Sequence, residues 1–369
     1  MELLKIKRRM FFPNEFKILF LILFFLLSIS FLGQYSAFNG DFSEPVQKHL
    51  LRIFSGIALG GCVYWCNFKM WSNFAYGFYA TTFVALIIVE ILGTIKLGAQ
   101  RWIDLYFFTF QPSELMKLSL ILALSRYYSL LPADEIAILK NHIPPLLMML
   151  LPVLLILKQP DLGTAGVLFF VGCGMIFLSG FPMKIFVGGS ISALLLCPFG
   201  WYFLHDYQKN RILTFLDPDR DPLGTGYHVL QSKIAIGSGH LLGKGFLQGT
   251  QNKLNFLPEK NTDFIFTTIA EEVGFIGSVL TIMLFVALIL YFFWSGSAAK
   301  NLFSKLLCRG LGLLLFLHVF INIAMVMGLM PVVGIPLPLL SYGGSSMITF
   351  MVSCGLIMAS LASKKNTQD

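Results

Sequence analysis

The chain has 369 residues, of which 56% are hydrophobic and only 12% are charged, and its mean hydropathy is +0.75. This composition excludes an ordinary soluble globular protein and predicts a polytopic membrane protein. The formal net charge of +8 is spread over loops that flank apolar runs, where basic residues set topology and attract anionic lipid. We therefore expect no nucleic-acid partner.

Apolar segments of spanning length follow one another along the chain. About 20 apolar residues cross ~30 Å of hydrocarbon as a helix, and ten segments reach or approach that length. We therefore predict an all-α polytopic membrane protein, a single domain over residues 1–369, with one long extracytoplasmic loop at 205–262. Proline and glycine blur the boundaries of the fifth to seventh spans. The ten predicted spans are residues 17–36, 50–67, 73–93, 112–131, 143–157, 162–180, 183–204, 263–294, 306–330 and 339–362.

The distribution of basic residues predicts the orientation of these spans. An even number of spans puts both termini on one side, and the segments on that side carry most of the loop Lys and Arg, including Lys5, Arg8 and Lys364. By the positive-inside rule we expect both termini in the cytoplasm and a multi-pass protein in the cytoplasmic (inner) membrane. Arg101 and Asp161 then face outward.

The stretch NFLPEKNTDFIFTTIAEE, residues 255–272, joins the long polar loop to the very apolar eighth span. Asp263 lies at this junction, where a carboxylate is solvated and still close to a membrane-bound substrate, so it is our candidate catalytic base. The alternative is that Asp263 or Thr262 caps the helix, since both residue types accept from free N–H groups at an N-terminus. The two roles are compatible.

The eighth span is longer than a bilayer requires. As a straight helix, Asp263 to Trp294 would be about 48 Å long, whereas Val273 to Trp294 alone covers about 33 Å. We expect the first turns, with Glu271 and Glu272, to lie at or above the outer interface or to line a polar cavity.

Span four also carries charge at its outer end, where Glu114 and Lys117 are three residues apart and share a helix face. Ionisable residues in spans usually face a cavity or a partner. Two interpretations stay open: an internal ion pair, or a Lys117 that meets an anionic head group while Glu114 orients it. Just upstream, GAQRWID places Arg101 at the interface.

The long loop supplies further positive charge from Arg211, Lys233 and Lys244. Residues 227–236 have Val229, Leu230, Ile234 and Ile236 on an apolar side with Gln231, Ser232 and Lys233 between them, and predict a short helix in the interface plane. GSGHLLGKG is not a P-loop, because it lacks the GxxxxGK spacing and the following Ser or Thr. Its glycines would let backbone N–H groups approach a phosphate.

After span nine, the stretch GLMPVVGIPLPLLSYGGSSM contains helix-breaking prolines and a Gly-Gly pair. Non-helical backbone at membrane depth is tolerated only inside protein or along a cavity. We predict a re-entrant wall of the same pocket; a plain loop between spans is the alternative.

Several motifs then resemble one family. FQPSELMK, QPDLGT, LDPDRDPLGTGYHVLQSKIAIGSG, FLPEKNTDFIF and PVVGIPLPLLSYGGSS occur in the order and spacing of the SEDS family (shape, elongation, division and sporulation proteins), and most resemble its RodA branch. The resemblance implies a ten-span peptidoglycan glycosyltransferase that polymerises lipid II and releases undecaprenyl diphosphate. It implies a class B penicillin-binding protein transpeptidase and other elongation-complex membrane proteins as partners. The family's essential aspartate falls on Asp263, and its span-four residues on Glu114 and Lys117.

The predicted substrate-binding residues are Glu114, Lys117, Arg101, Arg211, Lys233 and Lys244. No cofactor is assigned, and a divalent cation, Mg²⁺ or Mn²⁺, is left open. Many family members have His where this chain has Asn261, so a proton-transfer role for that His does not carry over. The alternative functions are a flippase or transporter for a lipid-linked precursor, and a non-catalytic membrane scaffold for a transpeptidase.

Overall fold

The computed structural model describes residues 14–96, 99–104, 109–200, 202, 206–221, 224–254 and 259–365. Within these ranges, each of the ten predicted spans coincides with an α-helix, and six helical stretches are long and apolar enough to cross a membrane. The all-α prediction is confirmed. The ten helices are α2 (Asn14–Ala37), α3 (Glu44–Trp65), α4 (Phe68–Leu92), α5 (Pro112–Leu130), α6 (Ile143–Lys158), α7 (Leu162–Leu178), α8 (Met183–Gly200), α12 (Ile265–Ala298), α13 (Leu302–Val326) and α14 (Gly344–Lys365).

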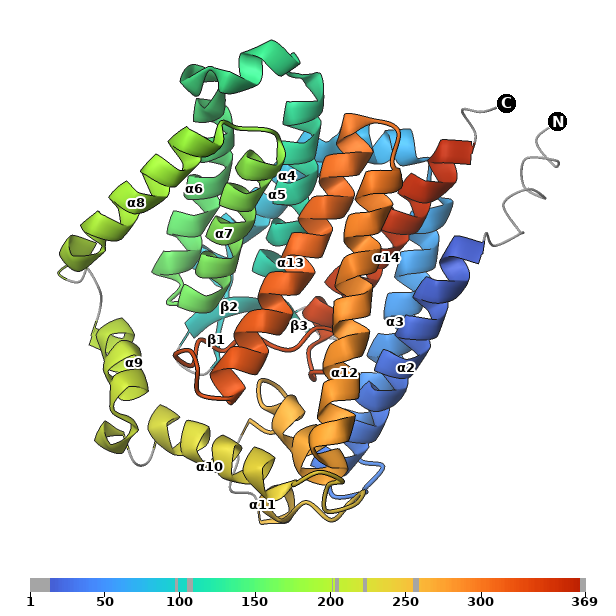
Figure 1. Cartoon of the computed structure of the whole chain (residues 1–369), viewed down its shortest axis with the longest axis vertical. Helices are drawn as coiled ribbons and strands as arrows, with labels where there is room; N and C mark the ends of the chain where they lie inside the picture. Colours follow the sequence, from blue (N-terminus) through green and yellow to red (C-terminus); the bar gives the residue numbers. More distant parts are fainter. Residues whose placement is uncertain are drawn as a thin grey trace.

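The two ends of the bundle carry different parts of the chain. Helix α2 begins and α14 finishes at the same end (Figure 1). The short 3-10 helices between α5 and α6, η1 (Ala133–Ala137) and η2 (Leu139–His142), also lie there. The opposite end carries the described part of the long loop, which forms α9 (Asp206–Leu216), η4 (Pro218–Arg220), α10 (Thr225–Ser238) and α11 (Thr250–Lys253).

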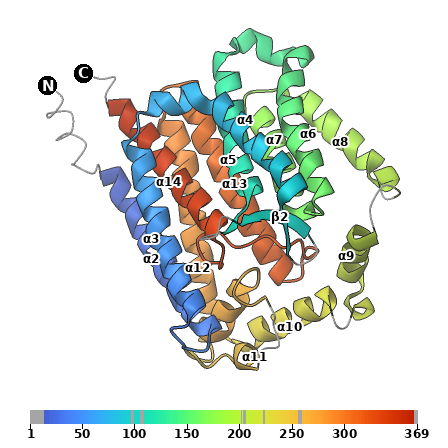
Figure 2. The same ribbon diagram turned by 180° about the vertical axis from the view of Figure 1, so that it is seen from behind.

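Helix α10 lies across the end of the bundle instead of along it (Figures 1 and 2). Its inner face is small and polar: Ser232 is buried between the Thr267 hydroxyl, at 2.8 Å, and the Val326 carbonyl, at 2.7 Å. Leu230 and Ile234 are exposed on the outside. The predicted helix is confirmed, and its exposed apolar side chains suit an interfacial position.

Helices α3 and α14 pack closely because glycines face each other. A Cβ added to Gly60 would come within 2.7 Å of the Met351 carbonyl, and one added to Gly355 within 2.3 Å of the Gly60 carbonyl. Small residues allow such backbone contact, which drives helix association where lipid is as apolar as the side chains.

A small antiparallel sheet, which the sequence did not lead us to expect, connects α4 to α5. Strand β1 (Thr94–Lys96) pairs with β2 (Ala99–Asp104), which pairs with β3 (Thr109–Phe110). Figure 2 shows β2 at the same end of the bundle as α10. Strands of two to six residues are too short for an alternating pattern to distinguish them from a loop.

Helix α12 is broken at Gly274, which has φ 66° and ψ −164°. The break separates the first turns from the rest of the helix, and the sequence did not predict it; the position of these turns at the outer interface stays a prediction. The glycine-rich loop before α11 forms hydrogen bonds with the backbone on both sides of this break. Phe275 N–H donates to the His240 carbonyl at 2.8 Å, and Lys244 N–H donates to the Glu271 carbonyl at 3.0 Å. A Cβ on Gly274 would lie 2.2 Å from the Gly243 nitrogen. These loop glycines therefore serve close packing, and an approach of their N–H groups to phosphate stays a prediction.

Residues 331–342, between α13 and α14, are non-helical. Ile335, Leu337 and Leu340 are at most 2% exposed. The prediction of a non-helical segment inside the protein is confirmed, and α14 begins at Gly344, five residues after the predicted start of span ten at 339.

Candidate active site

Asp263 lies just before α12, in the non-helical stretch that leads into it. The N-cap of α12 is Phe264, and no side chain caps the helix. The Thr262 hydroxyl donates instead to the Glu259 carboxylate at 2.8 Å. The capping interpretation of Asp263 and Thr262 is therefore wrong, because the helix starts two residues after the carboxylate. Asp263 is partly buried.

Donors from other parts of the chain hold Asp263 in place through hydrogen bonds to three successive backbone carbonyls. The amide of Asn322 on α13 donates to the Asp263 carbonyl at 2.9 Å and to the Ile335 carbonyl at 2.7 Å. The Ser341 hydroxyl donates to the Thr262 carbonyl at 2.6 Å. The Asn261 carbonyl accepts from Tyr342 N–H and from the Gln34 amide, both at 2.8 Å. The backbone at the carboxylate is thus positioned by residues far away in the sequence.

The re-entrant segment also forms a wall beside the carboxylate. Gly334 has φ +72°, and a Cβ built on it would lie 3.4 Å from Asp263 Oδ2. The segment therefore lies beside the Asp263 carboxylate, and its role as the wall of a substrate pocket stays a prediction.

Charge around Asp263 is mixed. Burial raises the pKa of its carboxyl group to about 7, and the negative charges of Glu259 and Asp161 act in the same direction. Arg211 and Arg101 oppose this rise. A pKa near neutrality suits a general base, because the group is ionised for part of the time and still accepts a proton readily.

Arg101 reaches the site from strand β2 and is fixed by the turn before α7. Its guanidinium donates to the carbonyls of Gln159 and Pro160, and its Nε lies 3.6 Å from Asp161 Oδ2. Asp161 in turn caps α7, accepting from Thr164 N–H at 3.1 Å. The motif QPDLGT therefore holds an arginine close enough to influence Asp263.

Arg211 and Lys233 line one small cavity together with Gly328 and Pro331. They come from α9 and α10 and meet the chain that follows α13. The structure thus brings two predicted cations of the long loop together, and Arg211 is close enough to lower the pKa of Asp263.

Lys117 and Glu114 lie inside the bundle, with side chains 1% and 4% exposed. Lys117 Nζ donates to Glu114 Oε1 at 2.7 Å and lies 2.8 Å from His318 Nε2 on α13. Because lysine only donates, this ring nitrogen is the acceptor, and we assign the ring proton to Nδ1. The internal ion pair, one of the two interpretations, is the one observed. A contact between this pair and substrate stays a prediction.

Lys244 is engaged with α12. Its ammonium group contacts Glu271 Oε1 at 2.7 Å and the Thr250 hydroxyl at 2.8 Å. Glu271 also accepts from the backbone N–H groups of Thr250 and Gln251. These contacts attach the glycine-rich loop to the first turns of α12. A role for Lys244 in substrate binding stays a prediction.

Our sequence reasoning missed His318 and Asn322. Both are polar residues of the ninth predicted span, four apart and therefore on one helix face, and both are at most 1% exposed. A polar side chain within a span is by itself a reason to suspect a functional or positioning role. That signal was present in the stretch HVFIN.

The described residues do not form a ready metal site. Among them, no group of three or more His, Cys, Asp or Glu side chains is arranged to hold a metal ion.

Comparison with known proteins assigns the family. The model of the FtsW, RodA and SpoVE family, described as a cell cycle protein, matches residues 9–366. The chain is 40% identical to the peptidoglycan glycosyltransferase MrdB of Escherichia coli strain K12, over 92% of this chain and 91% of that protein. It is 32% identical to the peptidoglycan glycosyltransferase RodA of Treponema pallidum, over 93% and 96% of the two chains.

Solved structures agree with this assignment. A chain from a study of how a peptidoglycan synthase complex coordinates polymerization and crosslinking superposes with a TM-score of 0.82 at 33% identity, covering 96% of this chain and 98% of that one. The rod shape determining protein RodA of Thermus thermophilus superposes with a TM-score of 0.71 at 27% identity, covering 96% and 97%. The chain is therefore an integral membrane protein that belongs to the FtsW, RodA and SpoVE family, the SEDS family that its motifs resemble.

Proposed function

We propose that this chain, a peptidoglycan glycosyltransferase by family, polymerises lipid II into glycan strands during cell elongation, with Asp263 as the general base. The observation that carries the proposal is the position of Asp263: a partly buried carboxyl group with a pKa of about 7, clamped at its backbone and flanked by Arg101 and Arg211.

In the proposed reaction, the 4-hydroxyl of the acceptor sugar attacks C1 of the donor sugar. Asp263 takes the hydroxyl proton as the new C1–O bond forms and the bond from C1 to the diphosphate breaks. Undecaprenyl diphosphate leaves with the bonding electron pair, and a single displacement inverts the configuration at C1. One base is sufficient because diphosphate is already a good leaving group.

Arg211, Arg101 and Lys233 are the cations that we assign to the negative charge on the departing diphosphate. Pre-arranged positive groups stabilise charge that develops in the transition state more effectively than water does. We place no step on Mg²⁺ or Mn²⁺, and the requirement for a divalent cation is left to experiment. Polymerisation measured with and without EDTA tests whether the reaction needs a cation.

We further propose that both termini lie in the cytoplasm and that Asp263 faces the cell exterior, as the distribution of basic residues predicts. A class B penicillin-binding protein transpeptidase is the proposed partner. The similarity to a chain of a synthase complex that couples polymerization and crosslinking supports it.

The deciding experiment is a polymerisation assay with purified full-length protein, lipid II and the transpeptidase. Wild-type protein should make glycan strands, whereas Asp263→Ala should make none and still bind the transpeptidase. Wild-type rates from the variant would refute the assignment of the base. Movement of lipid II across liposomes without glycan synthesis would favour a transporter, and retained partner binding with neither activity would favour a scaffold.

A further inference from the structure

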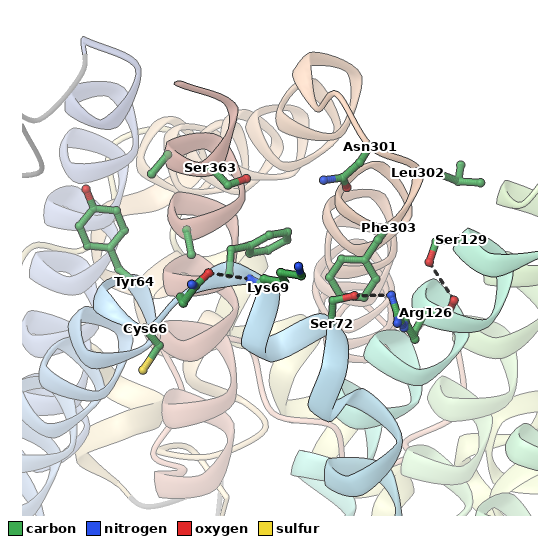
Figure 3. A pocket seen from close by; sticks show the side chains of 14 residues that line it. Tyr64, Cys66, Lys69, Ser72, Arg126, Ser129, Asn301, Leu302, Phe303 and Ser363 are labelled. Atoms are coloured by element: carbon green, nitrogen blue, oxygen red, sulfur yellow. Dashed lines mark hydrogen bonds between the residues drawn. The ribbon is translucent and has the colours of Figure 1, made fainter. Parts of the chain in front are cut away.

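A second polar site lies at the end of the bundle that holds the two termini, away from Asp263. It is an open cavity of about 490 Å³ lined by the last turns of α3, α5 and α14 and the first turns of α4 and α13 (Figure 3). A cavity of this size falls in the range of pockets that bind small organic ligands.

The polar groups that line this cavity are mainly hydrogen-bond donors. Lys69 and Arg126 supply an ammonium and a guanidinium group, and none of the described lining residues is acidic. The Arg126 guanidinium is oriented by a 3.0 Å hydrogen bond from Nη1 to the Ser72 hydroxyl, drawn in Figure 3. Two cations therefore line one cavity that has no carboxylate among its described lining residues, so the cavity favours an anion.

Two asparagines add neutral donors. Asn67 Oδ1 accepts from Lys69 N–H at 3.0 Å, and Asn301 Oδ1 accepts from Ser304 N–H at 2.7 Å. These contacts cap α4 and α13 and fix which way each amide points, so each Nδ2 group remains as a donor. The hydroxyls of Ser129 and Ser363 donate to backbone carbonyls of their own helices.

The remaining wall is apolar and includes Tyr64, Phe68 and Phe303. A wall of this kind favours an organic group attached to the anion over a bare inorganic ion. Phosphate oxygens accept several hydrogen bonds and pair strongly with Arg. We propose that this cavity binds a phosphate ester, with Lys69 and Arg126 on the phosphate and the aromatic side chains on the organic part.

An anionic phospholipid and a soluble phosphate ester share this chemistry. We would test purified full-length protein in detergent with dioleoylphosphatidylglycerol, with the zwitterionic dioleoylphosphatidylcholine and with glycerol 1-phosphate, counting bound molecules by native mass spectrometry and measuring Tm. Binding of phosphatidylglycerol that glycerol 1-phosphate does not displace would identify a lipid. Displacement, with a rise in Tm from glycerol 1-phosphate alone, would identify a soluble ester.

The variants are Lys69→Gln and Arg126→Gln, with Lys140→Gln as the matched control, because Lys140 is exposed on η2, between α5 and α6, and does not line the cavity. Each lost charged hydrogen bond should weaken binding roughly 10-fold, and the control should bind like wild type. If Arg126→Gln unfolds because it loses the hydrogen bond to Ser72, the binding measured for Lys69→Gln alone tests the proposal, since Lys69 is exposed and its substitution should not unfold the protein. Unchanged binding in Lys69→Gln, or no preference of wild type for either anionic probe over phosphatidylcholine, would overturn the proposal.

Discussion

Asp263 and the Glu114–Lys117 pair are both ionisable groups of a membrane protein, yet they differ in exposure and in the groups that contact them. Asp263 lies in non-helical backbone, partly accessible, with cations near it that do not neutralise it. Glu114 and Lys117 contact each other inside the bundle, and Lys117 also contacts His318.

The difference follows from what each group has to do. A base must exchange a proton with substrate, so it needs access and a pKa near the working pH. An internal ion pair needs no access to substrate, and removing one partner leaves an uncompensated buried charge, which is costly. We therefore assign the chemistry to Asp263 and the positioning of α5 against α13 to the Lys117 cluster. Four measurements test this division.

The largest effect should come from Asp263→Asn, which keeps the shape of the side chain and removes the base. We expect the rate of lipid II polymerisation to fall by roughly 10²–10⁴-fold, the usual contribution of a general base. The Tm should not fall, because the raised pKa of Asp263 shows that the folded protein disfavours its ionised form. Glu259→Gln is the matched control and should keep most of the activity.

Lys117→Met should have the largest effect on stability. It leaves Glu114 and His318 without their shared donor, and breaking a buried pair costs about 3–5 kcal/mol of the free energy of unfolding. Unfolding curves in detergent measure this. The double variant Glu114→Gln, Lys117→Met should lose less than Lys117→Met alone. A stable Lys117→Met protein that is inactive would instead assign Lys117 to the substrate.

The dependence on pH should follow the Asp263 carboxyl, whose pKa is raised to about 7. The base works only when it is deprotonated, so the polymerisation rate should fall about 10-fold per pH unit below 7 and level off above it. Arg211→Gln removes a positive charge and should move the midpoint to higher pH, while Glu259→Gln should move it lower. A midpoint that neither variant shifts would argue against Asp263 as the titrating group.

The smallest effect should come from Lys244→Gln. The Lys244 side chain is 25% exposed, and Glu271 keeps its backbone donors Thr250 and Gln251. The Glu271 carboxylate is buried, but it keeps these donors and Lys244 is partly exposed, so the Tm should fall less than in Lys117→Met. A large rise in KM for lipid II with an unchanged Tm would show that Lys244 contacts substrate.

The sequence alone was sufficient for the helical architecture and for the location of the candidate base. Hydropathy is a local property, so it predicted the ten helices, whereas the break of α12 at Gly274 was not predicted. The polarity change at residues 255–272 was enough to select Asp263.

Only the tertiary structure decided which distant groups meet. His318 lies 201 residues from Lys117, and Asn322 and Ser341 hold the backbone at Asp263 from 59 and 79 residues away. The cavity at Lys69 and Arg126 needs turns from five helices. Such contacts depend on how helices pack against one another, and packing between remote segments leaves no periodic signal in either segment, so the partners of each polar side chain appear only once the bundle is assembled.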